Sequence, residues 1–333
     1  MIYPEGYESA LSLKETQRAT EFTRDRFQKN IGRALNLIRV TCPLFVTKAS
    51  GVNDDLNGVE RKVEFDMLNC DGTAQVVQSL AKWKRACLYR YGFERGEGIF
   101  TNMSAIRRDD LCDSLHSIYV DQWDWERVIA REDRNLDYLK DVVQKIVDAL
   151  AVTKDEVNAE FPQLKKTIDR NVVFVTTQEL EDMYPDLEPS ARENEFCKEH
   201  HTTFIIGIGD KLKSGKPHDG RAPDYDDWQL NGDLLLWNEV LDCAEEISSM
   251  GIRVDKETLL SQLDKAGCPE RAELPFHKYI IEELYPLSIG GGIGQSRVCL
   301  FMLEKAHVGE VQVSIWPEDM YMDCAAHGIY LLK

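Results

Sequence analysis

Long apolar runs, paired cysteines and a basic surface are all missing from this sequence of 333 residues. No apolar stretch approaches the roughly 18 residues that a membrane-spanning helix needs, and the charged N-terminal segment MIYPEGYESALSLKETQR lacks the apolar core of a signal peptide. The nine cysteines include no C-x-x-C pair, so neither a zinc site nor a disulfide framework is indicated. Free thiols in a reducing compartment, the cytoplasm, are expected instead.

The charge balance is strongly acidic, with 58 Asp and Glu against 40 Lys and Arg and a formal net charge of −18. Such a chain repels phosphate backbones, which argues against nucleic acid as the main partner. A nucleotide held in a local basic pocket remains compatible with this charge. Hydrophobic residues make up 43% of the chain, enough for one large or two small packed cores.

The hydrophobic pattern predicts one α+β domain over residues 1–333, an antiparallel sheet flanked by helices. Helices are expected at 8–36, 80–91, 132–152, 256–266, 272–284 and from about 294 to 305. Strands are expected at 37–40, 75–78, 98–107, 116–128, 172–175, 204–208, 233–237 and 245–254. The polar segment 210–231 is longer than an ordinary connection, and its part 210–226 is the expected lid over a site.

The segment SIGGGIGQSRVCLFML, residues 288–303, runs from a glycine-rich loop into a helical pattern. It fails as a dinucleotide fingerprint because Arg297 takes the place of the third glycine, and it has no P-loop lysine. What remains is G-x-G-x-x-R, in which Gly292 and Gly294 let backbone approach a ligand. An arginine in the first turn of a helix can stack on a base or bind a phosphate. A tight turn with an exposed arginine is the alternative.

Two other segments belong with this one. Arg107 ends an expected strand within the string RRD, and the first helix and strand end at Pro43. With Arg297, these segments resemble the three signature motifs of class II aminoacyl-tRNA synthetases. In that fold the first motif builds a dimer interface, and the arginines of the other two hold ATP. Two positions depart from the pattern: Asp109 stands where glutamate is usual, and Ser296 where an acidic residue often precedes the arginine.

Five strings make the resemblance more specific: QSLAKWKR, HSIYVDQWDWERV, RAPDYDDW, EISSMGIRV and IGGGIGQSR. Together they resemble the ammonia-dependent asparagine synthetases, or aspartate–ammonia ligases, over almost the whole chain. The resemblance implies a class II synthetase-like catalytic domain without an anticodon-binding domain, in a homodimer whose interface includes residues 1–45. It also implies that L-aspartate, ATP and ammonia yield L-asparagine, AMP and diphosphate through a β-aspartyl-adenylate, with Mg²⁺.

Adenylation brings two anions together, so it needs cations. The resemblance assigns Arg107 to the α-phosphate and packs Arg297 against ATP, and Arg253 is a third candidate; for each, a surface arginine is the alternative. Mg²⁺ is expected on Asp233 and Glu246. The neighbouring Glu245 would point to the opposite side of a strand, and a solvated strand-end acid is the alternative role for Glu246.

Lys84 and Arg221 are the expected partners of the carboxylates of aspartate. Gln122 and Asp124, expected to hold the α-ammonium group of aspartate or to orient the substrate, lie on one face of a strand at period two. Trp123 and Trp125 take the other face and are expected in the core. The other expected substrate-binding residues are Ser79, Ser117, Asp226, Ser248 and Ser249.

Ammonium has no lone pair, so a group must bind the cation and take its proton. The resemblance assigns this to Asp54, with Gln122 orienting the intermediate; Asp55 is the rival, and turn capping is the alternative for both. Glutamine as nitrogen donor would need an N-terminal cysteine where Ile2 stands, so free ammonia is implied. The competing functions are a tRNA synthetase, disfavoured by the net charge, and a regulator that binds amino acid or nucleotide without catalysis.

Overall fold

The structure, a computed structural model, describes residues 1–54, 56 and 60–333. Its helices are α1 (Leu13–Leu35), α2 (Ala81–Tyr91), α3 (Leu136–Glu160), α4 (Thr177–Met183), α5 (Pro189–His200), α6 (Lys256–Lys265), α7 (Pro275–Ile281), α8 (Gln295–Met302) and α9 (Glu318–Ala326). Its 3₁₀ turns are η1 (Lys48–Ser50), η2 (Arg131–Asp133), η3 (Pro269–Glu273) and η4 (Val308–Glu310). No helix in this described part is both long and apolar enough to cross a bilayer.

The strands form one large and one small sheet. They are β1 (Leu37–Arg39), β2 (Phe45–Thr47), β3 (Glu64–Asp66), β4 (Thr73–Val76), β5 (Gly98–Ile106), β6 (Tyr119–Val128), β7 (Val173–Thr176), β8 (Thr202–Ile206), β9 (Asp226–Asn238), β10 (Cys243–Arg253) and β11 (Ser288–Gly294).

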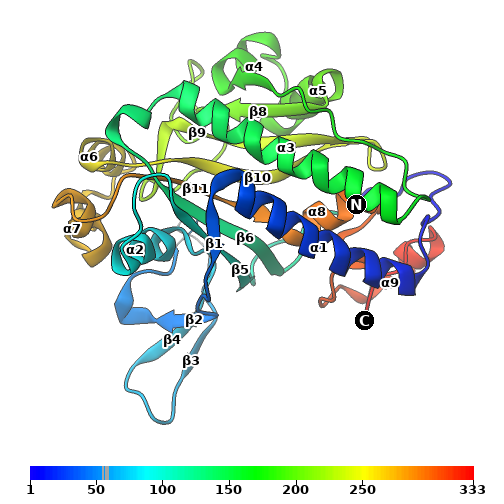
Figure 1. The fold of residues 1–333 in the computed structure, drawn as a ribbon, viewed down its shortest axis with the longest axis horizontal. Coiled ribbons are helices and arrows are strands. Elements are labelled where there is room, and N and C mark those ends of the chain that lie inside the picture. The colour runs from blue at the N-terminus through cyan, green and yellow to red at the C-terminus, as the bar shows by residue number, and fades with distance from the viewer. Residues whose placement is uncertain (55, 57–59) are drawn as a thin grey trace.

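The large sheet has eight strands in the order β1-β5-β6-β11-β10-β9-β8-β7. All central pairs are antiparallel, which confirms the predicted α+β class, but each edge adds a parallel pair, β1 with β5 and β7 with β8. The small sheet, β2-β4-β3, was not predicted and extends away from the body of the molecule below α2 (Figure 1).

One face of the large sheet is covered by helices α1 and α3, which lie side by side across it, and by α8 (Figure 1). The buried core between helices and sheet includes Phe27, Ile31 and Leu35 of α1, Val143, Ile146 and Val147 of α3, and Trp123, Trp125, Met250 and Ile293 of the sheet. Burying each such side chain contributes roughly 1.5–3 kcal/mol. Because the helices take one face, polar side chains of the central strands are left to the other.

Helix α1 begins later than its predicted start at residue 8, because Ser12 and Glu15 form a capping box. The backbone N–H of Glu15 donates to Oγ of Ser12 at 3.3 Å, and that of Ser12 donates to Oε2 of Glu15 at 2.9 Å. This satisfies two of the N–H groups that a helix leaves unpaired at its start. The helix ends where Asn36 adopts a left-handed conformation, with φ of 54°.

Three other boundaries differ from the predictions. Helix α3 starts at Leu136 because Asn135 caps it, accepting from the N–H of Tyr138 at 2.9 Å, and it continues to Glu160 because its last turns are still buried. Strand β9 begins at Asp226, so the predicted loop 210–231 is shorter than expected. Helices α4, α5 and α9 were not predicted.

The glycine-rich segment is strand β11 in the centre of the sheet, and its prediction as a loop was wrong. The missing side chains make room for groups on neighbouring strands. A Cβ at Gly290 would lie 2.0 Å from Oε2 of Glu126, and one at Gly292 would lie 2.5 Å from Oε1 of Gln122. Both glycines have ordinary extended backbone, so space and not a special φ requires glycine here.

We expect Gly290→Ala to lower the free energy of unfolding by about 2–4 kcal/mol, because its methyl group would push the carboxylate of Glu126 out of a buried ion pair. Urea unfolding measures this. The double variant Gly290→Ala/Glu126→Ala removes the overlap, so its cost should fall well short of the sum of the two single costs. Strict additivity would refute the steric explanation.

Candidate active site

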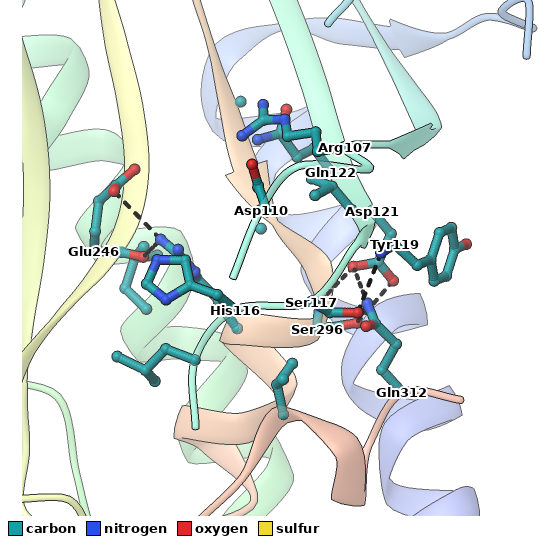
Figure 2. Close-up of a pocket in the computed structure, with 17 residues that line it drawn as sticks. Arg107, Asp110, His116, Ser117, Tyr119, Asp121, Gln122, Glu246, Ser296 and Gln312 are labelled. Carbon is teal, nitrogen blue, oxygen red and sulfur yellow. Dashed lines mark hydrogen bonds and ion pairs between the residues drawn. The ribbon is translucent and has the colours of Figure 1, made fainter. Parts of the chain in front are cut away.

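The polar face of the sheet carries two adjoining cavities of about 620 and 1040 Å³. The first lies between the start of α8, the end of β6 nearest Tyr119 and the loop that joins β5 to β6 (Figure 2). The second lies over β6, β9, β10 and the start of α2. Five residues line both and so mark their junction: Arg107, Asp110, Gln122, Glu246 and Gly292.

The structure brings both predicted ATP-binding arginines to the first cavity. Arg297 projects from the first turn of α8, donates to the backbone O of Glu246 at 2.9 Å and pairs with its carboxylate at 3.3 Å. Arg107 directly follows β5, and its Nε donates to the backbone O of Gln78 at 3.4 Å. Gly294 lines the same cavity. Ser117, predicted to bind aspartate, also lies here and not in the second cavity; its hydroxyl donates to Oγ of Ser314.

Strand β6 alternates as predicted. Gln122 and Asp124 line the second cavity, whereas Trp123 and Trp125 are buried in the core. Asp124 forms an ion pair with Lys84, whose side chain is 1% exposed. Burial lowers the pKa of Lys84, although the charge of Asp124 opposes this.

Lys84 also donates to the backbone O of Gly291 at 3.0 Å. An ammonium group has three donors, so one remains for a bound carboxylate. Lys84 was predicted to bind a carboxylate of aspartate and Asp124 its ammonium group, and these two residues form an ion pair with each other.

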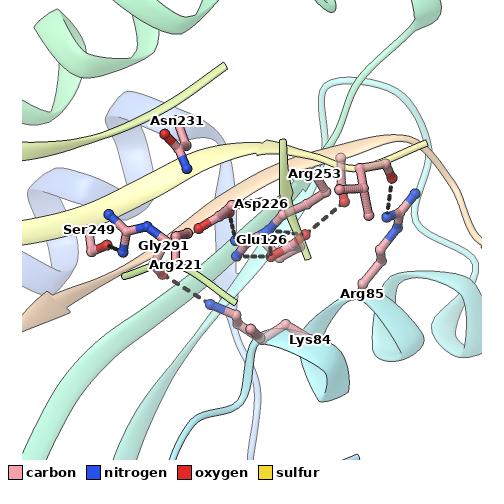
Figure 3. A network of polar contacts seen from close by, with 12 residues as sticks. Lys84, Arg85, Glu126, Arg221, Asp226, Asn231, Ser249, Arg253 and Gly291 are labelled. Atoms are coloured by element: carbon pink, nitrogen blue, oxygen red, sulfur yellow. Dashed lines mark hydrogen bonds and ion pairs between the residues drawn. The ribbon is translucent and has the colours of Figure 1, made fainter. Parts of the chain in front are cut away.

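A buried ion network forms the floor of the second cavity (Figure 3). Arg253 donates from Nε and Nη2 to Glu126 at 3.0 and 2.8 Å, and from Nη1 to Asp226. Ser288 adds a hydrogen bond to Glu126 at 2.7 Å. Burial acts to raise the pKa of Glu126, but Arg253 lowers it below its usual value. These bonds use three of the five N–H donors of Arg253, so its predicted contact with phosphate stays a prediction.

Arg221 comes from the loop before β9 and crosses the second cavity to two predicted site residues. It donates to Oγ of Ser249, and it pairs with Oδ1 of Asp233 at 2.6 Å. Burial, and the charge of Glu246, raise the pKa of Asp233 to about 6, although Arg221 opposes this. The predicted metal ligands Asp233 and Glu246 thus face one cavity and repel each other electrostatically, which a bound cation would relieve.

A bulge in β10 decides which of its side chains reach the site. The pairing with β9 shifts between Glu246 and Ser248, so Glu246 and Ser249 both line the second cavity despite their odd spacing. Ser248 was predicted to bind substrate, but it is buried and lines neither cavity. Glu245 is fully buried, accepts from Nδ2 of Asn238 at 2.7 Å, and burial raises its pKa to about 8. The side chain of Glu246 is 43% exposed.

Asp54 lies behind the second cavity and does not line it. Its side chain is 1% exposed, and neither carboxylate oxygen has a hydrogen-bond partner among the residues described. Burial raises its pKa, against the charge of Lys82. The charge of Asp54 in turn adds to the effect of burial in raising the pKa of Tyr225, a residue that lines the second cavity. The rival candidate Asp55 lies outside the described residues.

The two remaining residues from the sequence analysis, Ser79 and Asp109, differ in where they lie. Ser79 lines the second cavity and accepts from the N–H of Ala81 at 3.1 Å. Asp109, the departure from the motif, turns towards Arg61 at the surface, which lowers its pKa to about 2.

Sequence reasoning missed several residues that line the cavities, among them Asp110, His116 and Tyr225. Asp110 and His116 line the first, where the ring of His116 lies 2.9 Å from Asp113, and Tyr225 lines the second. The signal for two of them was available, because His116 and Tyr225 lie within the strings HSIYVDQWDWERV and RAPDYDDW. Asp110 directly follows the string RRD.

The arrangement suits the binding of anions next to a hard cation. Five cationic side chains line the cavities, those of Lys84, Arg107, Arg221, Arg253 and Arg297. No three His, Cys, Asp or Glu side chains converge on a metal position within residues 1–54, 56 and 60–333. Two carboxylates completed by oxygens of a ligand are, however, how proteins usually hold Mg²⁺.

Solved structures of tRNA synthetases share this fold. The asparaginyl-tRNA synthetase of Pyrococcus horikoshii, complexed with asparaginyl-adenylate, superposes with a TM-score of 0.66 at 14% identity, over 92% of this chain and 70% of that one. The asparaginyl enzyme of Entamoeba histolytica gives 0.64 at 16% identity, over 90% and 66%. The chain therefore spans about two thirds of the length of these synthetases, and the predicted class II synthetase-like fold is confirmed.

Sequence comparison is more specific. The family model of aspartate-ammonia ligase matches residues 14–328. The aspartate–ammonia ligase of Clostridium perfringens is 54% identical over 333 residues, which are 100% of this chain and 99% of its own. That of Bacillus cereus is 53% identical over 325 residues, covering 98% and 99%. With a family model that spans most of the chain and relatives this similar over its whole length, the chain belongs to the aspartate–ammonia ligase family.

Proposed function

We propose that the protein amidates the β-carboxylate of L-aspartate with free ammonia, at the expense of ATP, and releases L-asparagine, AMP and diphosphate. The observation that carries this proposal is the identity of 54% to an aspartate–ammonia ligase over the whole chain. The two adjoining cavities, lined by cations and joined at Arg107, support it. We further propose that the chain is one catalytic domain and acts in the cytoplasm.

In the first step, an oxygen of the β-carboxylate attacks the α-phosphorus, and diphosphate leaves. ATP occupies the first cavity and aspartate the second, so the reacting atoms meet at the junction, which Arg107 lines. There its charge offsets the negative charge that grows on the phosphoryl oxygens in the transition state. Arg297, on α8, holds the nucleotide from the other side of the first cavity.

Aspartate binds through its carboxylates to Lys84 and Arg221, and its ammonium group faces Asp124 and Asp226. Ser79 and Ser249 complete this part of the site. Because Lys84 is buried, Arg221 is half-buried and carboxylates already orient both, little ordering is needed when the substrate enters.

Asp233 and Glu246 would hold Mg²⁺ together with oxygens of ATP. When bound, the ion neutralises phosphate charge and orients the leaving diphosphate. Their mutual repulsion in the absence of a cation supports this assignment.

In the second step, nitrogen attacks the carbonyl carbon of the adenylate, and the C–O bond to AMP breaks with its electron pair leaving on the phosphate. Ammonium must lose one proton before the attack and a second one after it. Asp54 binds the ammonium and takes the first proton, and Gln122 orients the carbonyl from the junction of the cavities.

The protein acts as a homodimer with residues 1–45 at its interface. Three exposed apolar side chains in and next to this segment support this: Ile38 (59% exposed), Leu44 (51%) and Phe45 (47%). Isolated exposed apolar residues are common, but a cluster on one segment is typical of an interaction surface.

The purified protein should release AMP and diphosphate only when aspartate, ammonium and ATP are all present, and without tRNA. Separating the nucleotides by chromatography measures this. ADP and phosphate as products would exclude an adenylate, and a requirement for tRNA would indicate a synthetase.

Asp54→Asn should lower asparagine formation by about 100-fold, because the amide cannot take the proton of ammonium. Aspartate-dependent exchange of diphosphate into ATP, which needs only the first step, should change little. Asp66→Asn, an exposed acid on β3, is the matched control and should leave both rates unchanged. Equal loss of both activities in Asp54→Asn would reject the role.

Glu245 and Glu246 are adjacent in β10 but point to opposite sides of the strand. Glu246→Gln and Glu245→Gln are therefore a matched pair of variants. Glu246→Gln should raise the Mg²⁺ concentration for half-maximal activity by at least about tenfold, because a ligand is lost. Glu245→Gln should not. An unchanged Mg²⁺ requirement in Glu246→Gln would exclude this residue as a ligand.

Glu245→Gln should instead change stability with pH. The folded pKa of about 8 exceeds the ordinary 4.5, so the stability contributed by protonated Glu245 is complete below pH 4.5 and is lost as pH rises through 8. Glutamine mimics the protonated form, so the variant should match the wild type near pH 4.5 and be more stable above pH 8, by at most about 5 kcal/mol. Thermal unfolding at both pH values measures this; equal curves would contradict a buried neutral carboxyl.

A further inference from the structure

Asp121 of β6 joins three elements on the far side of the first cavity (Figure 2). It is 5% exposed and accepts from the backbone N–H of Ser296 at 3.0 Å and from its hydroxyl at 2.9 Å. Gln312 donates to the same hydroxyl at 2.9 Å. Arg24 of α1 donates to Oδ2 of Asp121 at 2.8 Å and approaches the hydroxyl of Ser296 at 3.3 Å.

Helix α8 has no cap of its own, because its N-cap residue is Gly294, which has no side chain to accept a hydrogen bond. The first N–H groups of a helix need acceptors and favour negative charge. Asp121 provides both from the neighbouring strand through its bond to the N–H of Ser296. Asp121 therefore caps the N-terminus of α8, although it belongs to a neighbouring strand.

Asp121 and Ser296, the two residues joined by this hydrogen bond, each directly precede a residue of the site. Gln122 follows Asp121, and Arg297 follows Ser296. In the sheet, Gln122 is paired with Gly294, so both anchors lie at the same level of β6 and β11. A shift of the Asp121–Ser296 contact would therefore move the backbone of Gln122 and Arg297 together.

Within the described chain, Arg24 is the one cation that forms an ion pair with Asp121. The other groups near Asp121 are the neutral side chains of Ser296 and Gln312 and the thiol of Cys299, whose pKa burial raises to about 11. The side chain of Arg24 is 33% exposed and belongs to a helix on the opposite face of the sheet from the ligands. Without Arg24, the buried carboxylate of Asp121 would keep three hydrogen bonds but lose its counter-charge, which is costly at such depth.

We propose that Arg24 is a positioning residue for the nucleotide half of the site. It holds Asp121, Asp121 holds the first turn of α8, and that turn presents Arg297 beside the backbone that presents Gln122. This inference rests on the proposed function in that it assigns the first cavity to ATP. It predicts an effect on ATP and adenylation, and little effect on aspartate. Lys84 and Arg221 lie on other elements, and Asp124 of β6 is held by its ion pair with Lys84.

The variants Arg24→Met, Arg24→Lys and Arg24→Met/Asp121→Asn test this, with Arg18→Met, an exposed arginine of the same helix, as control. Arg24→Met should weaken ATP binding, measured by calorimetry, by roughly tenfold and raise the KM for ATP in diphosphate exchange to the same extent. The KM for aspartate should stay within about twofold. Arg24→Lys, which keeps the charge, should restore most of the ATP affinity.

The double variant distinguishes positioning from general destabilisation. Asparagine keeps an acceptor for the N–H of Ser296 but removes the unpaired charge, so Arg24→Met/Asp121→Asn should bind ATP more tightly than Arg24→Met alone. Unchanged ATP affinity in Arg24→Met overturns the proposal, as does an equal loss for ATP and aspartate that the double variant does not relieve. A wild-type protein without exchange activity would refute the proposed function, and ATP affinity would still decide the role of Arg24.

Discussion

Strand β11 carries no side chain from Gly290 to Gly292, and the polar face of the sheet is built in the space that this leaves. The carboxylate of Glu126 and the amide of Gln122 occupy positions where a Cβ on β11 would stand. Glu126 in turn orders Arg253 and, through it, Asp226. A larger residue at position 290 would displace the buried charges of Glu126 and Arg253, which are far more costly to leave unpaired than apolar groups are to shift. The glycines thus serve the ligands indirectly, by allowing a polar floor in the middle of a central sheet.

The alternation of side chains along a strand explains why part of the site could be predicted from the sequence. On β6, tryptophans at every second position alternate with Gln122 and Asp124, and period two alone separates core from cavity. The same rule separated Glu245 from Glu246, but it failed for Ser248 and Ser249, because a bulge shifts the register between them and Glu246. A bulge depends on pairing with a distant strand, so periodicity does not reveal it. For the same reason the glycines were taken for a loop: their neighbours in space, and not in sequence, make them a strand.

The sequence also did not indicate which charged side chains pair with one another. Motif resemblance brought Lys84, Asp124, Arg221, Asp233 and Arg253 to one site, and all of them line the second cavity. It did not indicate that Lys84 pairs with Asp124, or that Arg253 is taken up by two carboxylates. These contacts span 27 to 127 residues of chain and exist only after folding. They also separate roles: Lys84 keeps a donor for a ligand, whereas Arg253 holds other residues in place.

The two halves of the site are held in different ways, and this follows from where each lies on the sheet. The second cavity lies over the middle of the strands, where opposite charges on adjacent strands can orient one another across the same face. The first lies at the end of β6 and β11, where Gly294 gives way to a helix whose N-cap residue has no side chain. The residues of the first cavity are therefore held in place from the face of the sheet that the helices cover, by Asp121 of β6. Gln122, the next residue of β6, points to the opposite face, where the ligands bind. One strand thus orders both halves of the site, because its alternating side chains reach both faces of the sheet.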